Sequence, residues 1–416
     1  MNENTPLSTQ ADEQDLDEAL REYMEELNAR IGETKPVPQV PVTGWEFILA
    51  FRHVTEDMIR LFATVNGDMN PLWRDAEYAR RSPWGGIIAP PLFVDTIASV
   101  AGLPAPPKMK GWRPYQGGSI LRQYKPFRHG DVIDAEDIWR GIEEHSNPAR
   151  PHRTFVLSGE RRFRNQNGEI VCAILSRIPA TVPRSGTGDY TASVPSGAGR
   201  ERHRYSEEDL QEIYAHYDDE LAGKLRRGAI PRYWEDVREG DDLGLTIKGP
   251  LDIEDLASYL GVSGAGLANA SKWAAIRAML DMAPRDPVTG AYHFPMDWHL
   301  DDYCAQQVGQ PYAINFGSYM HLYCTHAINN WLGDHGWLRE FDARINAPMF
   351  IGETMKITGE VVRTYEEGGR GLVDLALRGV EWNGLELMKV RAVVQLPHRG
   401  RPNEVVEDVL SASGAS

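Results

Sequence analysis

The same order of turns and strands occurs in both halves of the chain. The first half reads PFRHGDVIDAEDIWRGIEE and then TFVLSGERRFRNQNGEIVCAILSRIP, and the second reads APMFIGETMKITGEVVRTYEE and then GLVDLALRGVEWNGLELMKVRAVVQLP. Each has a glycine–acid turn (Gly130-Asp131, Gly352-Glu353), alternating strands, an Asn-Gly hairpin turn (Asn167-Gly168, Asn383-Gly384) and a last strand that ends in proline. Agreement in this order indicates a duplicated unit, with a small insertion in the first copy within HSNPARPHR.

Each copy also has one apolar helix before its strands. In the second copy, GSYMHLYCTHAINNWLG has an apolar face at helical spacing, formed by Met320, Tyr323, Cys324, Ala327, Ile328 and Trp331. In the first copy, APPLFVDTIASVAG has one formed by Leu92, Phe93, Ile97 and Val100, with prolines where a first turn tolerates them. A buried helix and a long antiparallel sheet, twice over, predict an α+β fold in which each sheet wraps its helix.

The length of 416 residues suggests two domains with extra segments. We expect one domain over residues 44–184 and a second over 230–398. Residues 185–229 form a linker, rich in Gly, Ser and Thr, with a helix that starts after Ser206. Residues 1–43 hold an acidic helix and a Pro-rich stretch, and 399–416 a flexible tail. The acidic helix, a docking or dimer helix, has a thin apolar stripe at Leu16, Leu20, Met24, Leu27 and Ile31.

Charge and cysteine content narrow the classes of partner. Lys and Arg total 44 and Asp and Glu total 60, which gives a net charge of -16. Such a negative surface does not attract nucleic acid or an anionic membrane over long range, so neither is expected as a main partner. The three cysteines lack metal-ligand spacing, so we expect no disulfide framework, no metal site and no cofactor. With no apolar run of membrane length and no secretory signal pattern, the sequence predicts a cytoplasmic protein.

Both copies resemble a known family of enzymes. The first, GDMNPLWRDAEYARRSPWGGIIAPPLF, resembles the amino-terminal domain of MaoC-like, fatty-acid-synthase-type dehydratases. The second, HLDDYCAQQVGQPYAINFG with NNWLGDHGWL and APMFIGETMKITGEVV, resembles their carboxy-terminal domain, so the resemblance spans roughly 44–398. It implies a double hotdog fold and reversible hydration of a 2-enoyl-CoA to an (R)-3-hydroxyacyl-CoA, in fatty-acid or steroid side-chain metabolism.

The family motif G-D-x-N-P-x-H-x-D-x-x-x-A is divided between the copies. The first copy matches it at Gly67, Asp68, Asn70, Pro71, Asp75 and Ala79, but has Trp73 in the histidine position. The second copy matches it at His299, Asp301 and Ala305 and lacks the G-D-x-N-P portion. Each copy therefore holds the half that the other lacks.

Hydration of an enoyl thioester needs a base for water, an acid for C2 and a donor for the enolate oxygen. His299 is the expected base, because it keeps the motif register; the alternative is a histidine that caps the helix beginning near Asp301. Asp297 is either its carboxylate partner or a solvated loop residue. Gly317 and Ser318, at the start of the second apolar helix, are expected to offer main-chain N–H groups, although glycine there also suits the start of a helix.

The first copy is expected to hold the substrate. Asp68 and Asn70 either line the acyl or pantetheine channel or form a turn that starts a helix. Trp73 is expected to shape the acyl pocket, although large aromatic residues more often lie in a core. In this copy Pro90 and Pro91 have no N–H group to polarise a thioester, which favours the second copy as the chemical half. His321 and His326 are assigned no role.

The segment AGLANASKWAAIRAMLDMAPRDPVTGAYHFPMDW, ahead of His299, replaces a short loop and is expected to be a lid or a wall of the site. The predicted function is therefore an acyl-CoA hydratase or dehydratase. Two alternatives stay open: a hotdog thioesterase, and a degenerate acyl-CoA-binding subunit that needs a partner. The expected partners are an acyl-CoA thioester and either a second copy of the chain or a partner subunit.

Overall fold

The structure is a computed structural model that describes residues 10–38, 50–98, 112–184, 197, 199–280 and 283–411. The expectations for Val100 and for most of the Gly-rich linker at 185–198 fall outside the described residues.

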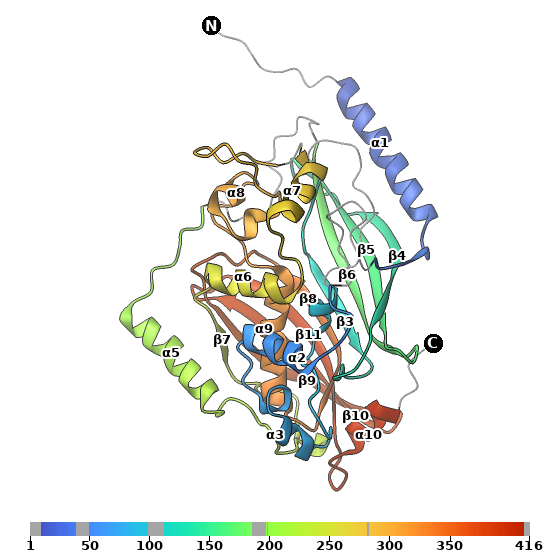
Figure 1. The fold of residues 1–416 in the computed structure, drawn as a ribbon, viewed down its shortest axis with the longest axis vertical. Helices are drawn as coiled ribbons and strands as arrows, with labels where there is room; N and C mark the ends of the chain where they lie inside the picture. The colour runs from blue at the N-terminus through green and yellow to red at the C-terminus, as the bar shows by residue number, and fades with distance from the viewer. Residues whose placement is uncertain are drawn as a thin grey trace.

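Strands of both copies form one 11-stranded sheet, and all the pairs among its described strands are antiparallel (Figure 1). The first copy supplies β3 (Gly118–Gln123), β4 (Asp134–Glu144), β5 (His152–Arg164) and β6 (Ile170–Pro183). The second supplies β8 (Trp337–Ile345), β9 (Met355–Glu367), β10 (Arg370–Glu381) and β11 (Glu386–Leu396). The order β4-β5-β6-β3 continues as β8-β11-β10-β9, so the second copy mirrors the first. This arrangement confirms the predicted α+β double hotdog.

Short strands complete the sheet. β1 (Thr34–Pro36) and β7 (Thr246–Lys248) pair with β4 and β9 at the two edges, and β2 (Arg113–Pro114) pairs with β6. Residues 145–151 connect β4 to β5, whereas only Gly368 and Gly369 connect β9 to β10. The small insertion predicted in the first copy therefore lies in the loop 145–151, between β4 and β5.

The two copies meet where β3 pairs with β8. Gly118 has φ +143°, and a Cβ atom there would lie 2.1 Å from the carbonyl oxygen of Ala343, so only glycine fits this close approach. Ion pairs join the copies across the seam, between Arg177 and Asp342 and between Arg122 and Glu340. The main cluster of buried apolar residues also draws on both copies. The two predicted domains thus share one sheet and one core.

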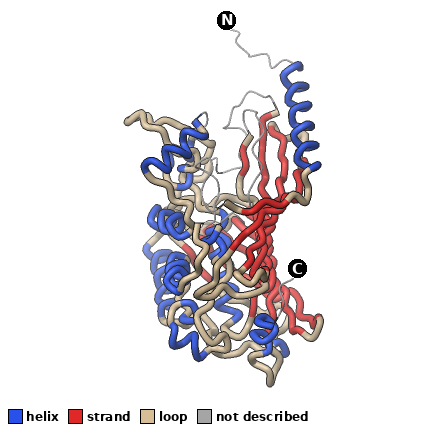
Figure 2. Tube along the Cα trace, turned by 45° about the vertical axis from the view of Figure 1, so that its right-hand side comes forward, coloured by secondary structure: helices blue, strands red, loops and turns tan. Residues whose placement is uncertain are grey.

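Most helices lie on one face of the sheet (Figure 2). The helix predicted in the second copy is α9 (Gly317–Leu332), whose residues from Tyr319 to Leu332 are all buried. It is preceded by α6 (Ile253–Val262), α7 (Asn269–Ala278), the 3-10 turn η5 (Asp297–His299) and α8 (Asp302–Gln306). The first copy has the matching series α2 (Glu56–Val65), η1 (Pro71–Trp73), α3 (Ala76–Arg81) and α4 (Val94–Ile97).

The helix predicted in the first copy is much shorter than expected. α4 ends at Ile97, because Ala98 is extended (φ -160°), and Leu92 lies before the helix with a positive φ of 65°. The left-handed conformation of Leu92 prevents an earlier start, and Pro90 and Pro91 disfavour helical backbone at the residue before each of them. Leu92, Phe93 and Ile97 are buried as predicted.

The amino-terminal helix α1 (Gln10–Ala29) covers the end of the sheet that α4 does not reach. Its Leu20 and Leu27 are buried against β4, β5 and β6, and the Nε1 of Trp139 donates to the Leu27 carbonyl (2.7 Å). Cys172 and Ile174 of β6 lie in the main core, and Ile178, Ala180 and Val182 lie under α1. Alternate residues of a strand face one side, so α1 continues the same buried face. Of the predicted stripe, Ile31 is exposed.

The remaining segments are helical where they are packed. α5 (Glu207–Leu221) starts after Ser206, as predicted, with a capping box between Ser206 and Asp209, and η3 (Trp234–Asp236) follows. The expectation of a flexible tail is wrong for residues 404–411. They form α10 (Glu404–Ser411), which buries Val405, Val406 and Val409. None of the helices in the described segments is both long and apolar enough to cross a membrane.

Candidate active site

The structure places Trp73 and His299 at equivalent positions of the repeat. η1 ends at Trp73, and α3 then begins after Asp75, whose carboxylate accepts from the N–H groups of Glu77 and Tyr78. η5 ends at His299, and α8 begins after Asp301, whose carboxylate accepts from the N–H of Cys304 (2.9 Å). The helix cap is thus Asp301, and the alternative role of His299 as that cap is wrong.

His299 is half-buried, and one ring nitrogen is held by the backbone. Its Nδ1 lies 2.7 Å from the carbonyl oxygen of Ile314, and its ring stacks on Phe316 with the centroids 3.9 Å apart. A carbonyl oxygen only accepts, so Nδ1 carries the hydrogen and Nε2 has its lone pair free. Burial lowers the pKa of His299 to about 4, against the opposing effect of the Ile314 hydrogen bond. The ring is therefore neutral at pH 7, in the form that accepts a proton.

Asp297 contacts other residues than His299. Its Oδ2 lies 2.7 Å from the Nζ of Lys272 and 3.6 Å from the Nδ1 of His293, and it accepts from the N–H of Phe294. Across the described ranges, no carboxylate oxygen lies within 4.0 Å of a His299 ring nitrogen. Lys272 belongs to α7, so Asp297 ties the segment ahead of η5 to the turn that carries His299.

The start of α9 offers unpaired N–H groups next to His299. Phe316, the residue before the helix, makes no side-chain cap, and Met320 is the first residue whose N–H bonds back along the helix, to the Phe316 carbonyl (3.1 Å). Within the described segments, the N–H groups of Gly317, Ser318 and Tyr319 have no hydrogen-bond partner, as expected for a first turn. His299, Phe316, Gly317 and Ser318 are all half-buried, and we call them the His299 site.

Two residues that the sequence reasoning did not single out lie under this site. The Oη of Tyr259 in α6 is 2.5 Å from the Oγ of Ser318 and donates to the Oδ2 of Asp95 in α4 at 3.5 Å. Asp95 and Tyr259 are both buried. A single carboxylate inside the apolar run APPLFVDTIA was the available signal for Asp95, because buried charges are rare. Tyr259 gives no such signal.

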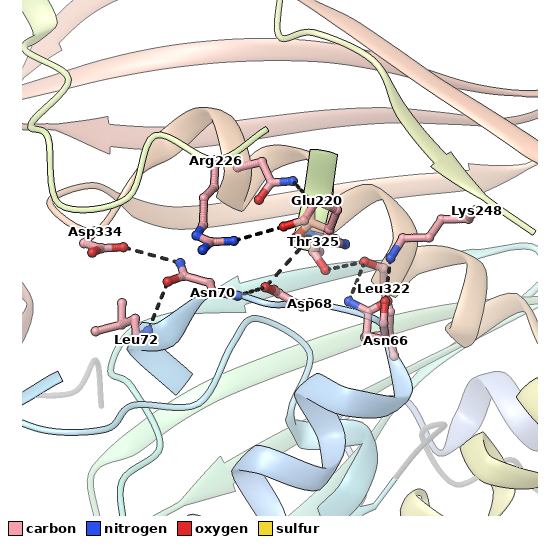
Figure 3. A network of polar contacts seen from close by, with 12 residues as sticks. Asn66, Asp68, Asn70, Leu72, Glu220, Arg226, Lys248, Leu322, Thr325 and Asp334 are labelled. Carbon is pink, nitrogen blue, oxygen red and sulfur yellow. Dashed lines mark hydrogen bonds and ion pairs between the residues drawn. The ribbon is translucent and has the colours of Figure 1, made fainter. Parts of the chain in front are cut away.

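Asp68 lies in a second polar centre, fully buried between the copies (Figure 3). Its Oδ1 accepts from the N–H of Asn70 (3.0 Å) and lies 3.9 Å from the Nε2 of His326. His326 in turn lies 3.2 Å from the Oε1 of Glu220. The Nζ of Lys248 donates to the carbonyl of Asn66 (2.5 Å). We call Asp68, Glu220, Lys248 and His326 the buried clamp. They hold four segments together, since Asp68 lies in the first copy, Glu220 in α5, Lys248 in β7 and His326 in α9.

Charge balance stabilises the buried clamp. Burial raises the pKa of Glu220, but the contacts with His326, Lys248 and Asn330 outweigh it and bring the pKa to about 2. Burial lowers the pKa of Lys248 to about 8, although Glu220 and Asp68 oppose the change. Asp68, Glu220 and His326 place one ligand atom each within 4.8 Å of one another, a spacing that suits a cation. The single charge of Lys248 acts on Glu220 and Asp68 from a longer distance and offsets one of their two negative charges, and His326 contacts Glu220 directly, so the centre links these segments electrostatically.

Asn70 borders the buried clamp, and Trp73 lies at the end of the turn that Asn70 caps. The side chain of Asn70 caps η1 by accepting from the N–H of Leu72 (3.0 Å), and it donates to Asp334 (3.3 Å). Trp73 is buried beside Trp84, and the two line a cavity of about 20 Å³, which has room for about one water. For Asp68 and Asn70 this geometry favours the structural alternative over a channel lining, and it favours a core position for Trp73. The signals for Glu220, Lys248 and His326 were weak, because charged residues on amphipathic segments are usually solvated.

Comparisons with known proteins agree with this architecture. The family described as FAS1-like, dehydratase domain region matches residues 42–174. A UPF0336 protein of Parafrankia sp. (strain EAN1pec) is 30% identical over 132 residues, which cover 30% of this chain and 83% of that protein. The fold is similar to that of a solved MaoC-like dehydratase, with a TM-score of 0.56, 17% identity and coverage of 89% of this chain and 99% of that chain.

A MaoC domain dehydratase from Chloroflexus aurantiacus J-10-fl is also similar in structure, with a TM-score of 0.52 and 13% identity over 89% of this chain and 96% of that one. At identities of 17% and 13%, the solved structures show only that the fold is shared. The 30% identity to the Parafrankia protein indicates common ancestry. These similarities agree with the mirrored order of the strands and with the motif positions in the two copies. The chain belongs to the family of this UPF0336 relative, its first copy contains a FAS1-like dehydratase domain region, and its two copies together have the double hotdog fold seen in MaoC-like dehydratases.

Proposed function

We propose that the chain adds water reversibly to a 2-enoyl-CoA and forms an (R)-3-hydroxyacyl-CoA at the His299 site. The observation that supports this most is that the neutral ring of His299, with Nε2 free, stacks on Phe316, directly before the unpaired N–H groups of α9. A proton acceptor and a set of fixed donors thus lie at one half-buried position. These are two of the three groups that hydration of an enoyl thioester needs.

In the proposed reaction, the Nε2 of His299 takes a proton from water as the water oxygen bonds to C3. The electron pair of the double bond moves toward the thioester oxygen, which the N–H groups of Gly317 and Ser318 stabilise. The helix start favours this negative charge, because the amino-terminal end of a helix carries a partial positive charge. Protonation at C2 then completes the hydrated product.

Replacement of His299 tests the proposal. The variant His299→Gln keeps a polar side chain but cannot act as a base, and we expect loss of hydration of crotonyl-CoA and of longer or ring-bearing enoyl-CoAs by about 100-fold or more. His335→Gln is the matched control. Like His299, His335 has its Nδ1 next to a backbone carbonyl oxygen, in this case that of Pro402 at 2.9 Å. Enoyl absorbance at constant free thiol measures hydration. Equal rates in His299→Gln and the wild type would remove His299 from the mechanism.

A second candidate is an acyl-CoA-binding subunit that needs a partner to complete the site. The lack of a carboxylate beside His299 in the described part of the chain favours this reading. It predicts tight binding of enoyl-CoA without turnover until the partner is added. Release of free thiol from the same substrates would point instead to a thioesterase.

A further inference from the structure

We propose that Asp95 supplies the proton for C2, through the hydroxyl groups of Tyr259 and Ser318. This role rests on the proposed hydratase function and fills its missing acid. The three residues come from three elements, since Asp95 lies in α4 of the first copy, Tyr259 in α6 and Ser318 in α9. The first copy would thus contribute to the chemistry without its own motif histidine.

The hydroxyl groups form a continuous path to the His299 site. The Oη of Tyr259 lies 3.5 Å from the Oδ2 of Asp95 and 2.5 Å from the Oγ of Ser318. The Tyr259 ring stacks on Tyr319 (centroids 4.7 Å apart) and packs against Phe316 (5.3 Å), so its position is fixed. Phe316 also stacks on His299. The path therefore ends at the same helix start as the proposed base.

The surroundings of Asp95 keep it able to hold a proton. Asp95 is 4% exposed, and the groups that face it are the Tyr259 hydroxyl from α6 and the Cys172 thiol from β6. In the described ranges, no Lys, Arg or His nitrogen lies within 4.0 Å of its carboxylate. Burial raises the pKa of Asp95 to about 7, with a small opposing effect of the Tyr259 hydrogen bond. A carboxyl group with a pKa near the working pH suits an acid that must both give and regain a proton.

The proton transfers balance. In the protonated form Asp95 donates its hydrogen bond to the Tyr259 oxygen, the reverse of the bond in the carboxylate form. As the C2–H bond forms, the Ser318 hydroxyl gives its proton to C2 and receives one from Tyr259, which receives one from Asp95. Asp95 becomes a carboxylate, while His299 holds the proton taken from water. Return of one proton from His299 to Asp95, through solvent, restores the starting state. Dehydration follows the same steps in reverse.

The test uses Asp95→Asn, Tyr259→Phe and their combination in the full chain. We expect each single variant to lower kcat for crotonyl-CoA hydration by about 100-fold with KM little changed, because the acid acts after binding. The double variant should lose no more than either single one, since both residues serve one path. The wild-type kcat should fall as the pH rises through about 7, where Asp95 loses its proton, and this decline should be absent in Asp95→Asn.

A structural role would give a different pattern. If Asp95 only ties α4 to α6, the variants would lower the melting temperature and leave kcat and its pH dependence as in the wild type, which would overturn the proposal. The infrared C=O band of a carboxylic acid supplies a readout without turnover. In the wild type, part of this band should disappear as the pH rises through about 7, and that part should be missing in Asp95→Asn. A wild-type spectrum without a band that titrates near pH 7 would also overturn the role. Failure of the wild type to hydrate any enoyl-CoA would reject the proposed hydratase function itself.

Discussion

His299 is the residue whose titration should set the low-pH limit of activity. Burial lowers its pKa to about 4, so the ring accepts a proton only above that pH. We expect kcat/KM for hydration to change by less than about twofold as the pH falls from 6.5 to 4.5, and to drop steeply below. Short assays, with circular dichroism to check the fold, would measure this. A midpoint near 6.5, the ordinary value for histidine, would contradict the environment described for the ring.

Glu220 should stabilise the fold through the buried clamp. Its folded pKa of about 2 lies below the ordinary value of 4.5, so its contribution is fully present above pH 4.5 and is lost as the pH falls toward 2. Glu220→Gln leaves Lys248 with one counter-charge fewer, and we expect the free energy of unfolding to fall by about 3 kcal/mol at pH 7. Urea unfolding at pH 7 and at pH 3.5 would show a smaller difference at the lower pH.

The matched control for Glu220 is Glu212, which lies on the same helix and pairs with Lys356 at the surface (3.2 Å). Exposed ion pairs contribute little, so Glu212→Gln should change the free energy of unfolding by less than about 1 kcal/mol. Equal losses in both variants would mean that burial does not set the strength of the clamp.

At the scale of the element, the start of α9 is held in place by contacts with both copies. A Cβ atom on Gly317 would lie 2.6 Å from the Cδ1 of Ile345 and 2.7 Å from the Cγ of Gln116. Gly317→Ala must therefore displace the first turn of the helix or its neighbours. We expect about a tenfold loss of kcat for hydration, because oxyanion donors act only when correctly placed.

The control for this glycine is Gly261, which lies in α6, where an added Cβ atom would meet no neighbouring atom within 4 Å. Gly261→Ala should keep full activity and raise stability by about 0.5 to 1 kcal/mol, since glycine weakens a helix interior. Steady-state kinetics and thermal unfolding of the two variants separate the effects. Full activity in Gly317→Ala would argue against the N–H groups of α9 as oxyanion donors.

At the scale of the whole molecule, the two copies should unfold together. They share the β3–β8 seam, the main apolar core and the buried clamp. We expect tryptophan fluorescence and circular dichroism to give one coincident transition in urea. Gly118→Ala, whose Cβ would meet the Ala343 carbonyl oxygen at 2.1 Å, should lower the midpoint of that whole transition. Two separated transitions would show that the copies are independent domains.

The sequence by itself determined the repeat, the register of Trp73 with His299 and the start of α5 after Ser206. These depend on local rules, since Asn-Gly turns, the capping residue Ser206 and strand alternation act over a few neighbours. The same rules predicted α9, which carries an apolar face along its full length. They failed for α4, which is bounded by a left-handed Leu92 and an extended Ala98, and for α10, whose order comes from burying Val405, Val406 and Val409.

Only the tertiary structure decided which side chains meet. Asp297 stands two residues from His299 yet pairs with Lys272 of α7, and Asp68 meets His326, which lies far away in the chain. Asp95 comes near Ser318 only because the second copy packs on the first and Tyr259 spans between them. Local spacing fixes a residue's position on its own turn or strand. The contacts across the core depend on how the two halves of the sheet and their helices close over one another, which no short stretch of sequence specifies.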